Sequence, residues 1–185
     1  MTARVATRTV GVALPVPDPW GSQIQQARRG YGEERAALIP THITLLPPTP
    51  ATEEQIGALY QHLEALAAGF PPFRVVLRGT GSFRPVSEVV FIQVAQGVSP
   101  CEQLESAVRS GPIDRELAFP YHPHVTVAHD LPSDVLDRAF NDLADFAADF
   151  VATHFTLYAH DGDEAWRPVR HFHLRGPVDP GYLPD

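Results

Sequence analysis

Short apolar stretches of strand length alternate with longer amphipathic stretches along the chain. Stretches rich in β-branched and aromatic residues predict strands over 8–15, 41–46, 73–77, 89–94, 124–127, 151–158 and 169–174. Apolar residues at helical spacing predict helices over 18–30, 51–68, 101–109 and 133–148. Because pairs of strands alternate with single helices, the pattern favours an α+β fold with largely antiparallel sheets.

Two segments repeat the order strand, helix, strand, turn, strand. The first opens with THITL at 41–45 and carries FRPV at 83–86, and the second opens with PHVTV at 123–127 and carries WRPV at 166–169. Two landmarks repeated at nearly one offset indicate a duplication. We therefore expect a single bilobal domain over 1–176 with pseudo-two-fold symmetry, its sheets flanking a central cleft. The lobe motifs are expected around 41–95 and 121–175, followed by an irregular tail over 177–185.

The amino-acid composition excludes several kinds of chemistry. All 14 basic residues are arginine, so Schiff bases, a P-loop lysine and a lysyl-nucleotide intermediate are excluded. Cys101 is the single cysteine, so an intrachain disulfide is excluded as well. The net charge of −8 gives no support for a basic face that grips long nucleic acid, and we expect no double-stranded nucleic acid partner.

No apolar run reaches the roughly 18 residues of a membrane span, so no membrane partner is expected. The first 16 residues carry Arg4 and Arg8 within a β-like stretch rather than a continuous apolar block. This is not the pattern of a signal peptide, and we expect a cytoplasmic protein.

Two tripeptides carry the candidate chemistry, His42-Ile43-Thr44 and His124-Val125-Thr126. Residues i and i+2 of a strand share a face about 6.6 Å apart, so each tripeptide presents an imidazole beside a hydroxyl. If the lobes oppose each other, the two sets suit a phosphodiester. A neutral histidine takes a proton and a protonated one gives a proton, each worth about 10²–10⁴ in rate, while the hydroxyls donate to the phosphate oxygens. Such a set needs neither a metal nor another cofactor.

A lone H-x-T in a strand is more commonly a half-buried structural histidine, and His154-Phe155-Thr156 is a third match. His154 follows the helix of the second repeat and leads into a hairpin turn at 161–163. We interpret His154 as structural.

The sequences THITLLPP at 41–48 and PYHPHVTVAH at 120–129 resemble the two H-x-T signatures of the 2H phosphoesterase superfamily, in its bacterial 2′-5′ RNA ligase-like (LigT-like) branch. The resemblance implies metal-independent action on 2′,3′-cyclic or 2′-5′ phosphodiesters of RNA ends or small nucleotides, with 2′-5′ ligation as the reverse reaction. It places the catalytic pairs on His42 with Thr44 and on His124 with Thr126. In cyclic-phosphate opening, it implies His124 as the base and His42 as the acid.

Three further residues are candidates for substrate binding. Phe83 and Trp166 occupy matching places in the two repeats and could stack a base, worth about 1–3 kcal/mol per base, or could cover the core. His129 stands where relatives often carry arginine or tyrosine near the substrate. Its charge would fade above about pH 6.5, and a polar residue at a strand edge is the alternative. Tyr121 and His122 are expected at the rim.

Two alternatives stay open. The chain could be a non-catalytic nucleotide- or phosphate-binding module that retains the cleft. His171 and His173, which share a strand face, could hold a divalent metal, although a structural pair is favoured. The acidic charge favours a nucleotide or short RNA as substrate, whereas the base identity, the reaction direction and the oligomeric state stay open.

Overall fold

The computed structural model of the protein describes residues 7–113 and 115–178. Most of the predicted tail, from 179 to 185, lies outside the described residues. The elements follow in the order β1 (Thr7–Pro15), α1 (Trp20–Gly30), the 3₁₀ turn η1 (Glu34–Ala37), β2 (His42–Thr52), α2 (Glu53–Gly69), β3 (Phe73–Ser82), β4 (Val89–Gln96), α3 (Val98–Arg109), β5 (His124–His129), α4 (Ser133–Asp142), β6 (Ala147–Ala152), β7 (His154–His160) and β8 (Arg167–His173).

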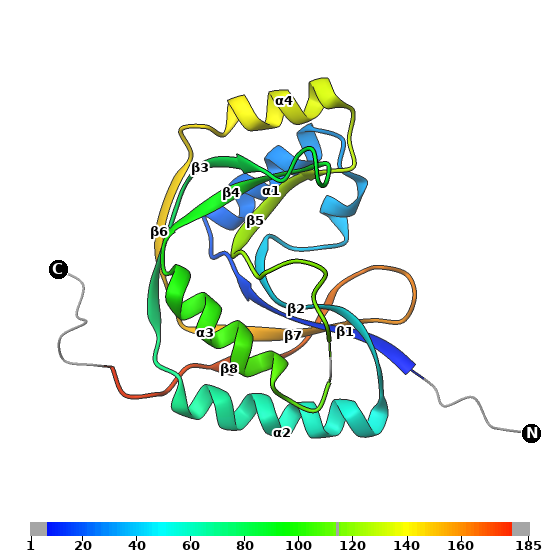
Figure 1. Cartoon of the computed structure of the whole chain (residues 1–185), viewed down its shortest axis with the longest axis vertical. Helices are drawn as coiled ribbons and strands as arrows, with labels where there is room; N and C mark the ends of the chain where they lie inside the picture. The colour runs from blue at the N-terminus through cyan, green and yellow to red at the C-terminus, as the bar shows by residue number, and fades with distance from the viewer. Residues whose placement is uncertain (1–6, 114, 179–185) are drawn as a thin grey trace, which may run out of the picture.

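The described strands form two four-stranded antiparallel sheets, ordered β2-β1-β7-β8 and β5-β4-β3-β6. Helix α2 packs against β2 and β8 of the first sheet, and α4 packs against β3, β4 and β5 of the second. These two helices lie at opposite ends of the molecule (Figure 1). The prediction of a bilobal α+β fold with antiparallel sheets is confirmed.

The repeats exchange strands between the sheets. The segment 41–95 places β2 in the first sheet and β3 and β4 in the second, while 121–175 places β5 and β6 in the second sheet and β7 and β8 in the first. Each segment therefore contributes to both lobes rather than forming one of them, because α2 and the β6–β7 junction carry the chain from one sheet to the other.

The predicted strand over 151–158 is wrong in one respect. The chain leaves β6, which pairs with β3, and enters β7, which pairs with β1 and β8, at Thr153. The predicted helix over 133–148 ends earlier, at Asp142, and residues 147–148 belong to β6. An apolar run in the sequence shows no boundary where a strand changes partners.

Helix α2 shows how local sequence positions the first motif. The Gln55 backbone N–H donates to the Thr52 hydroxyl at 3.2 Å, and the Thr52 N–H donates to the Gln55 side chain at 2.9 Å, which forms a capping box. Leu59 and Leu63 are fully buried on the inner face of the helix. The end of β2 is thus fixed by the start of α2, and apolar burial holds both against the core.

Within each motif the middle residue anchors the strand. Ile43 and Val125 have no exposed surface and belong to the core, whereas His42 and His124 beside them are part-buried. The alternation of a strand therefore turns the imidazoles away from the core, as the sequence pattern predicts. Across the described residues no helix is both long and apolar enough to cross a membrane.

Candidate functional site

The two motif strands meet at the junction of the sheets. β2 is an edge strand of the first sheet, β5 is an edge strand of the second, and the two contact each other. His42 and His124 are each the first residue of their strand. The Tyr121 hydroxyl, which precedes the second motif, donates to the Thr44 carbonyl at 2.8 Å. The fold thus brings the motifs side by side, and Tyr121 joins them.

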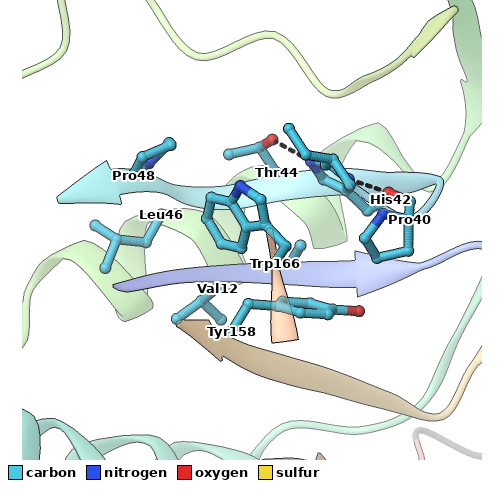
Figure 2. A pocket seen from close by; sticks show the side chains of 10 residues that line it. Val12, Pro40, His42, Thr44, Leu46, Pro48, Tyr158 and Trp166 are labelled. Carbon is cyan, nitrogen blue, oxygen red and sulfur yellow. Dashed lines mark hydrogen bonds between the residues drawn. The ribbon is translucent and has the colours of Figure 1, made fainter. Parts of the chain in front are cut away.

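The two imidazoles are held in the same way. His42 Nδ1 lies 2.6 Å from the Pro40 carbonyl, and His124 Nδ1 lies 2.7 Å from the His122 carbonyl. A carbonyl oxygen only accepts, so Nδ1 carries the proton and Nε2 of the neutral ring carries the lone pair. At His42 this lone pair accepts from the Thr44 hydroxyl, at 3.1 Å (Figure 2). Both rings therefore have the tautomer in which Nε2 can act as a base.

Burial makes both rings poor cations. It lowers the pKa of His42 from 6.5 to about 4, against the opposing effect of the Pro40 carbonyl, and the charges of Arg28 and His124 lower it further. Burial also lowers the pKa of His124, with a smaller contribution from the charge of His122. Both imidazoles are therefore neutral at pH 7 in the free protein. An anion bound between them would raise both pKa values.

A buried ion pair supports the segment before His42. Arg28, only 4% exposed, donates to the Glu33 carboxylate at 2.8 Å and to the Ile39 carbonyl at 2.9 Å. It also donates to the Gln25 side chain at 3.1 Å, which in turn accepts from the Thr41 hydroxyl at 2.9 Å. This network holds the chain on both sides of Pro40, whose carbonyl orients His42.

Sequence reasoning missed this network. Arg28 lies four and seven positions after Ile24 and Gly21, which form the buried face of α1 together with it. An arginine on the apolar stripe of an amphipathic helix is a signal for a buried, paired guanidinium.

Trp166 lies beside the first motif. Its ring centroid is 6.5 Å from that of His42, with 27° between the planes, and the ring packs edge-on against Tyr158 at 5.7 Å. These side chains surround a hollow with about 420 Å³ of empty volume (Figure 2). The other residues that line it are Val12, Ala13, Ile39, Pro40, Thr44, Leu46 and Pro48.

Phe83 lies beside the second motif. Its ring is perpendicular to that of His124, with centroids 5.0 Å apart, and it also contacts Phe91 at 4.4 Å. A second hollow, of about 1220 Å³ empty volume, extends from His124 past Phe83 to the segment 117–122. Thr44 lines both hollows, so the two hollows adjoin at the first motif. Phe83 and Trp166 both remain part-exposed, so each ring keeps a surface that a ligand could contact.

The structure does not bring His129 to the motifs. It is the last residue of β5, whereas His124 is the first. Its Nε2 lies 3.2 Å from the Asp130 carboxylate, in a hollow shared with Glu33 and Glu34. The hollow of His129 contains no residue of either H-x-T pair.

The third H-x-T match belongs to a separate cluster on β7 and β8. Thr156 is fully buried and its hydroxyl lies 2.8 Å from His171 Nδ1. The ring of His154 lies 5.2 Å from that of His171 and 5.5 Å from that of His173. Over 7–113 and 115–178, no three histidine, cysteine, aspartate or glutamate side chains are arranged to hold a metal ion.

The two-lobed α+β fold with paired H-x-T strands defines the class of protein. Residues 15–164 match the family described as the 2′-5′ RNA ligase superfamily, and the chain belongs to this family. The resemblance to LigT-like 2H phosphoesterases is thereby confirmed.

Two bacterial relatives cover most of the chain. A provisionally named phosphoesterase of Oceanobacillus iheyensis is 26% identical over 168 residues, which make up 89% of this chain and 96% of the relative. Another, from Bacillus cytotoxicus, is 30% identical over 142 residues, or 75% of this chain and 81% of the relative.

Solved structures share the fold. The E. coli LigT structure in complex with 3′-AMP has a TM-score of 0.63 at 22% identity, covering 91% of this chain and 99% of LigT. The structure of TT0787 from Thermus thermophilus has a TM-score of 0.66 at 20% identity, covering 92% of this chain and all of the other. The likeness supports the bilobal arrangement of the sheets.

Proposed function

We propose that the protein is a metal-independent phosphoesterase that opens 2′,3′-cyclic phosphates or cleaves 2′-5′ phosphodiesters of RNA ends or small nucleotides. The observation that carries the proposal is the matched pair of imidazoles. His42 and His124 start adjoining strands, and each has its Nδ1 bonded to the carbonyl two residues earlier. Membership of the superfamily supports a phosphoesterase acting on RNA-related substrates.

In the proposed reaction, Nε2 of His124 takes a proton from water as the water oxygen attacks phosphorus. The bond from phosphorus to the leaving ribose oxygen breaks, and Nε2 of His42 gives that oxygen a proton. The assignment of base and acid follows the family resemblance, and the reverse reaction, 2′-5′ ligation, exchanges the two roles. His42 must be protonated before the step, and the charge of the bound phosphate favours this by raising the pKa of the ring.

The threonines are proposed to hold the phosphate. In the free protein the Thr44 hydroxyl donates to Nε2 of His42. Once Nε2 is protonated it no longer accepts, so the hydroxyl becomes available to donate to a non-bridging oxygen. Thr126 occupies the corresponding position of the second motif, two residues after His124. Phe83 and Trp166 are proposed to stack against bases on the two sides of the phosphate.

The test is a product screen by chromatography with nucleoside 2′,3′-cyclic phosphates and 2′-5′-linked dinucleotides. His42→Ala and His124→Ala are each expected to lose at least a hundredfold in kcat/KM, whereas His154→Ala stays near the wild-type value. Activity is expected to survive incubation with EDTA. Substantial turnover in both motif variants would refute the proposal.

The same screen separates the non-catalytic alternative. If nucleotides bind in calorimetry but no product forms over hours, the protein is a binding module that retains the cleft. Loss of activity with chelator, restored by added metal, would contradict the metal-independent mechanism.

A further inference from the structure

The larger hollow contains a carboxylate on a largely apolar wall. Glu105 of α3 is only 3% exposed, yet it lines the hollow that starts at His124. Around it the wall is formed by side chains such as Phe83, Val86 and Leu117. A buried carboxylate next to empty space is costly unless it has partners, so its surroundings indicate what it can bind.

One oxygen of Glu105 has a partner within the protein. Arg109, one helical turn later, donates from Nε to Oε1. No donor to Oε2 is found among the described residues, and none of their buried side-chain oxygens is left without a hydrogen bond. Oε2 is therefore not fully buried, and Glu105 lines this hollow. The carboxylate therefore offers one acceptor to a ligand, while its other oxygen is held by Arg109.

Two exposed apolar side chains line the hollow. Phe119 is 64% exposed and Val86 is 70% exposed, and both line the hollow. Together with Phe83 they surround a space suited to a flat, largely apolar group with polar edges. The same space also reaches Thr44 and His124, where the phosphate is proposed to bind. A nucleotide whose phosphate lies between the motifs would place its base in this space.

We propose that this hollow is a nucleobase subsite and that Glu105 selects bases which present N–H donors at the edge facing it. Guanine offers N1–H and the N2 amino group side by side. Uracil offers one N3–H between two carbonyl oxygens, which the carboxylate repels. Guanine is therefore preferred and uracil is disfavoured, because the carboxylate attracts both N–H groups of guanine but repels the two carbonyl oxygens that flank N3–H of uracil. This inference rests on the proposed function, since the phosphate position orients the base.

A purely structural role for Glu105 makes a different prediction. Arg109 also donates to the Arg115 carbonyl, at 3.3 Å, so the ion pair ties α3 to the segment that leads to Phe119. Loosening that segment would weaken binding of every base alike. A selective loss of guanine binding therefore distinguishes recognition of the base by Glu105 from structural support of the segment by Glu105.

The experiment is calorimetric titration with 3′-GMP and 3′-UMP, neither of which contains a phosphodiester to cleave. The wild-type protein is expected to bind 3′-GMP at least tenfold more tightly than 3′-UMP. In Glu105→Gln, which can still accept from Arg109, this ratio is expected to fall below threefold through weaker binding of 3′-GMP. The matched control is Glu102→Gln, an exposed glutamate of the same helix, which should keep the wild-type ratio.

Equal affinities in the wild type, no detectable binding of either nucleotide, or an unchanged ratio in Glu105→Gln would overturn the inference. An equal loss for both nucleotides in that variant would also overturn it, in favour of the structural role. A guanine preference that depends on Glu105 without hydrolysis of any phosphodiester would support the subsite and refute the phosphoesterase. Hydrolysis without a base preference would support the phosphoesterase and refute the nucleobase subsite.

Discussion

The indole of Trp166 lies 6.5 Å from the imidazole of His42, although the two residues belong to different repeats. The reciprocal contact joins Phe83 of the first repeat to His124 of the second, at 5.0 Å. Because the repeats exchange strands between the sheets, each aromatic ring packs beside the histidine of the other repeat. The site is therefore built jointly by both halves of the chain, and neither repeat contains a complete half-site.

The pH dependence of kcat/KM follows from the two lowered pKa values. Burial lowers the pKa of His42 to about 4 and also lowers the pKa of His124. Since kcat/KM reports ionisations of the free enzyme, its bell-shaped profile should have both limbs below pH 6.5. The profile of kcat should lie at higher pH, because bound phosphate favours the protonated rings. Steady-state rates from pH 3.5 to 8 on a cyclic nucleotide test this, and limbs of kcat/KM at or above pH 6.5 would contradict it.

The burial of His42 should also make the free energy of unfolding depend on pH. When the folded-state pKa of a histidine is below its unfolded value, the unfolded chain takes up the proton first, so stability falls as the pH drops from 6.5 towards 4. For His42 the expected loss is roughly 3 kcal/mol. Urea unfolding of the wild type and of His42→Gln, at pH 7 and pH 4, measures this contribution. The wild type should lose more stability than the variant on acidification, and equal losses would show that the ring is not desolvated.

The buried ion pair in α1 supports the fold as well as the site. Arg28→Met leaves the Glu33 carboxylate buried without its partner, which typically costs about 3–5 kcal/mol. Urea unfolding at pH 7 measures the loss, and the exposed neighbour Arg29→Met serves as the control. The double variant Arg28→Met/Glu33→Leu should regain most of the stability. A change below about 1 kcal/mol in Arg28→Met would refute this role.

Gly11 allows the indole to lie over β1. A Cβ atom at this position would sit 2.0 Å from the ring of Trp166, so Gly11→Ala must displace the indole. We expect a several-fold higher KM and a shifted fluorescence maximum for Trp166, measured in a Trp20→Phe background. The control Gly57→Ala lies on α2, where an added Cβ meets no atom within 4 Å. Unchanged KM and fluorescence in Gly11→Ala would show that this ring position has no part in binding.

The sequence predicts elements where the pattern is local. The duplication predicts two lobes, and the alternation in His42-Ile43-Thr44 predicts which side chains point away from the core. The passage from β6 to β7 at Thr153 leaves no such signal, because an apolar strand has the same sequence pattern in either sheet. The support given to His42 by Arg28 depends on the approach of α1 to the segment 39–41, which is a tertiary contact.

Some residues of the candidate site can likewise be predicted from the sequence, and others cannot. The two H-x-T pairs are visible as motifs, and His154 lies apart from them, in a cluster with His171 and His173. His129 occupies a motif-related position but lies beside Asp130 at the far end of β5. Glu105 carries no motif, and only the fold places its carboxylate in the hollow beside His124.

The most direct measurement is kcat/KM for one 2′,3′-cyclic nucleotide in His42→Ala, His124→Ala and the double variant. If the rings act together on one phosphate, the double variant should be no slower than the slower single variant, because groups that act as a unit have non-additive effects. Losses that multiply in the double variant, or near wild-type rates in either single variant, would contradict the account.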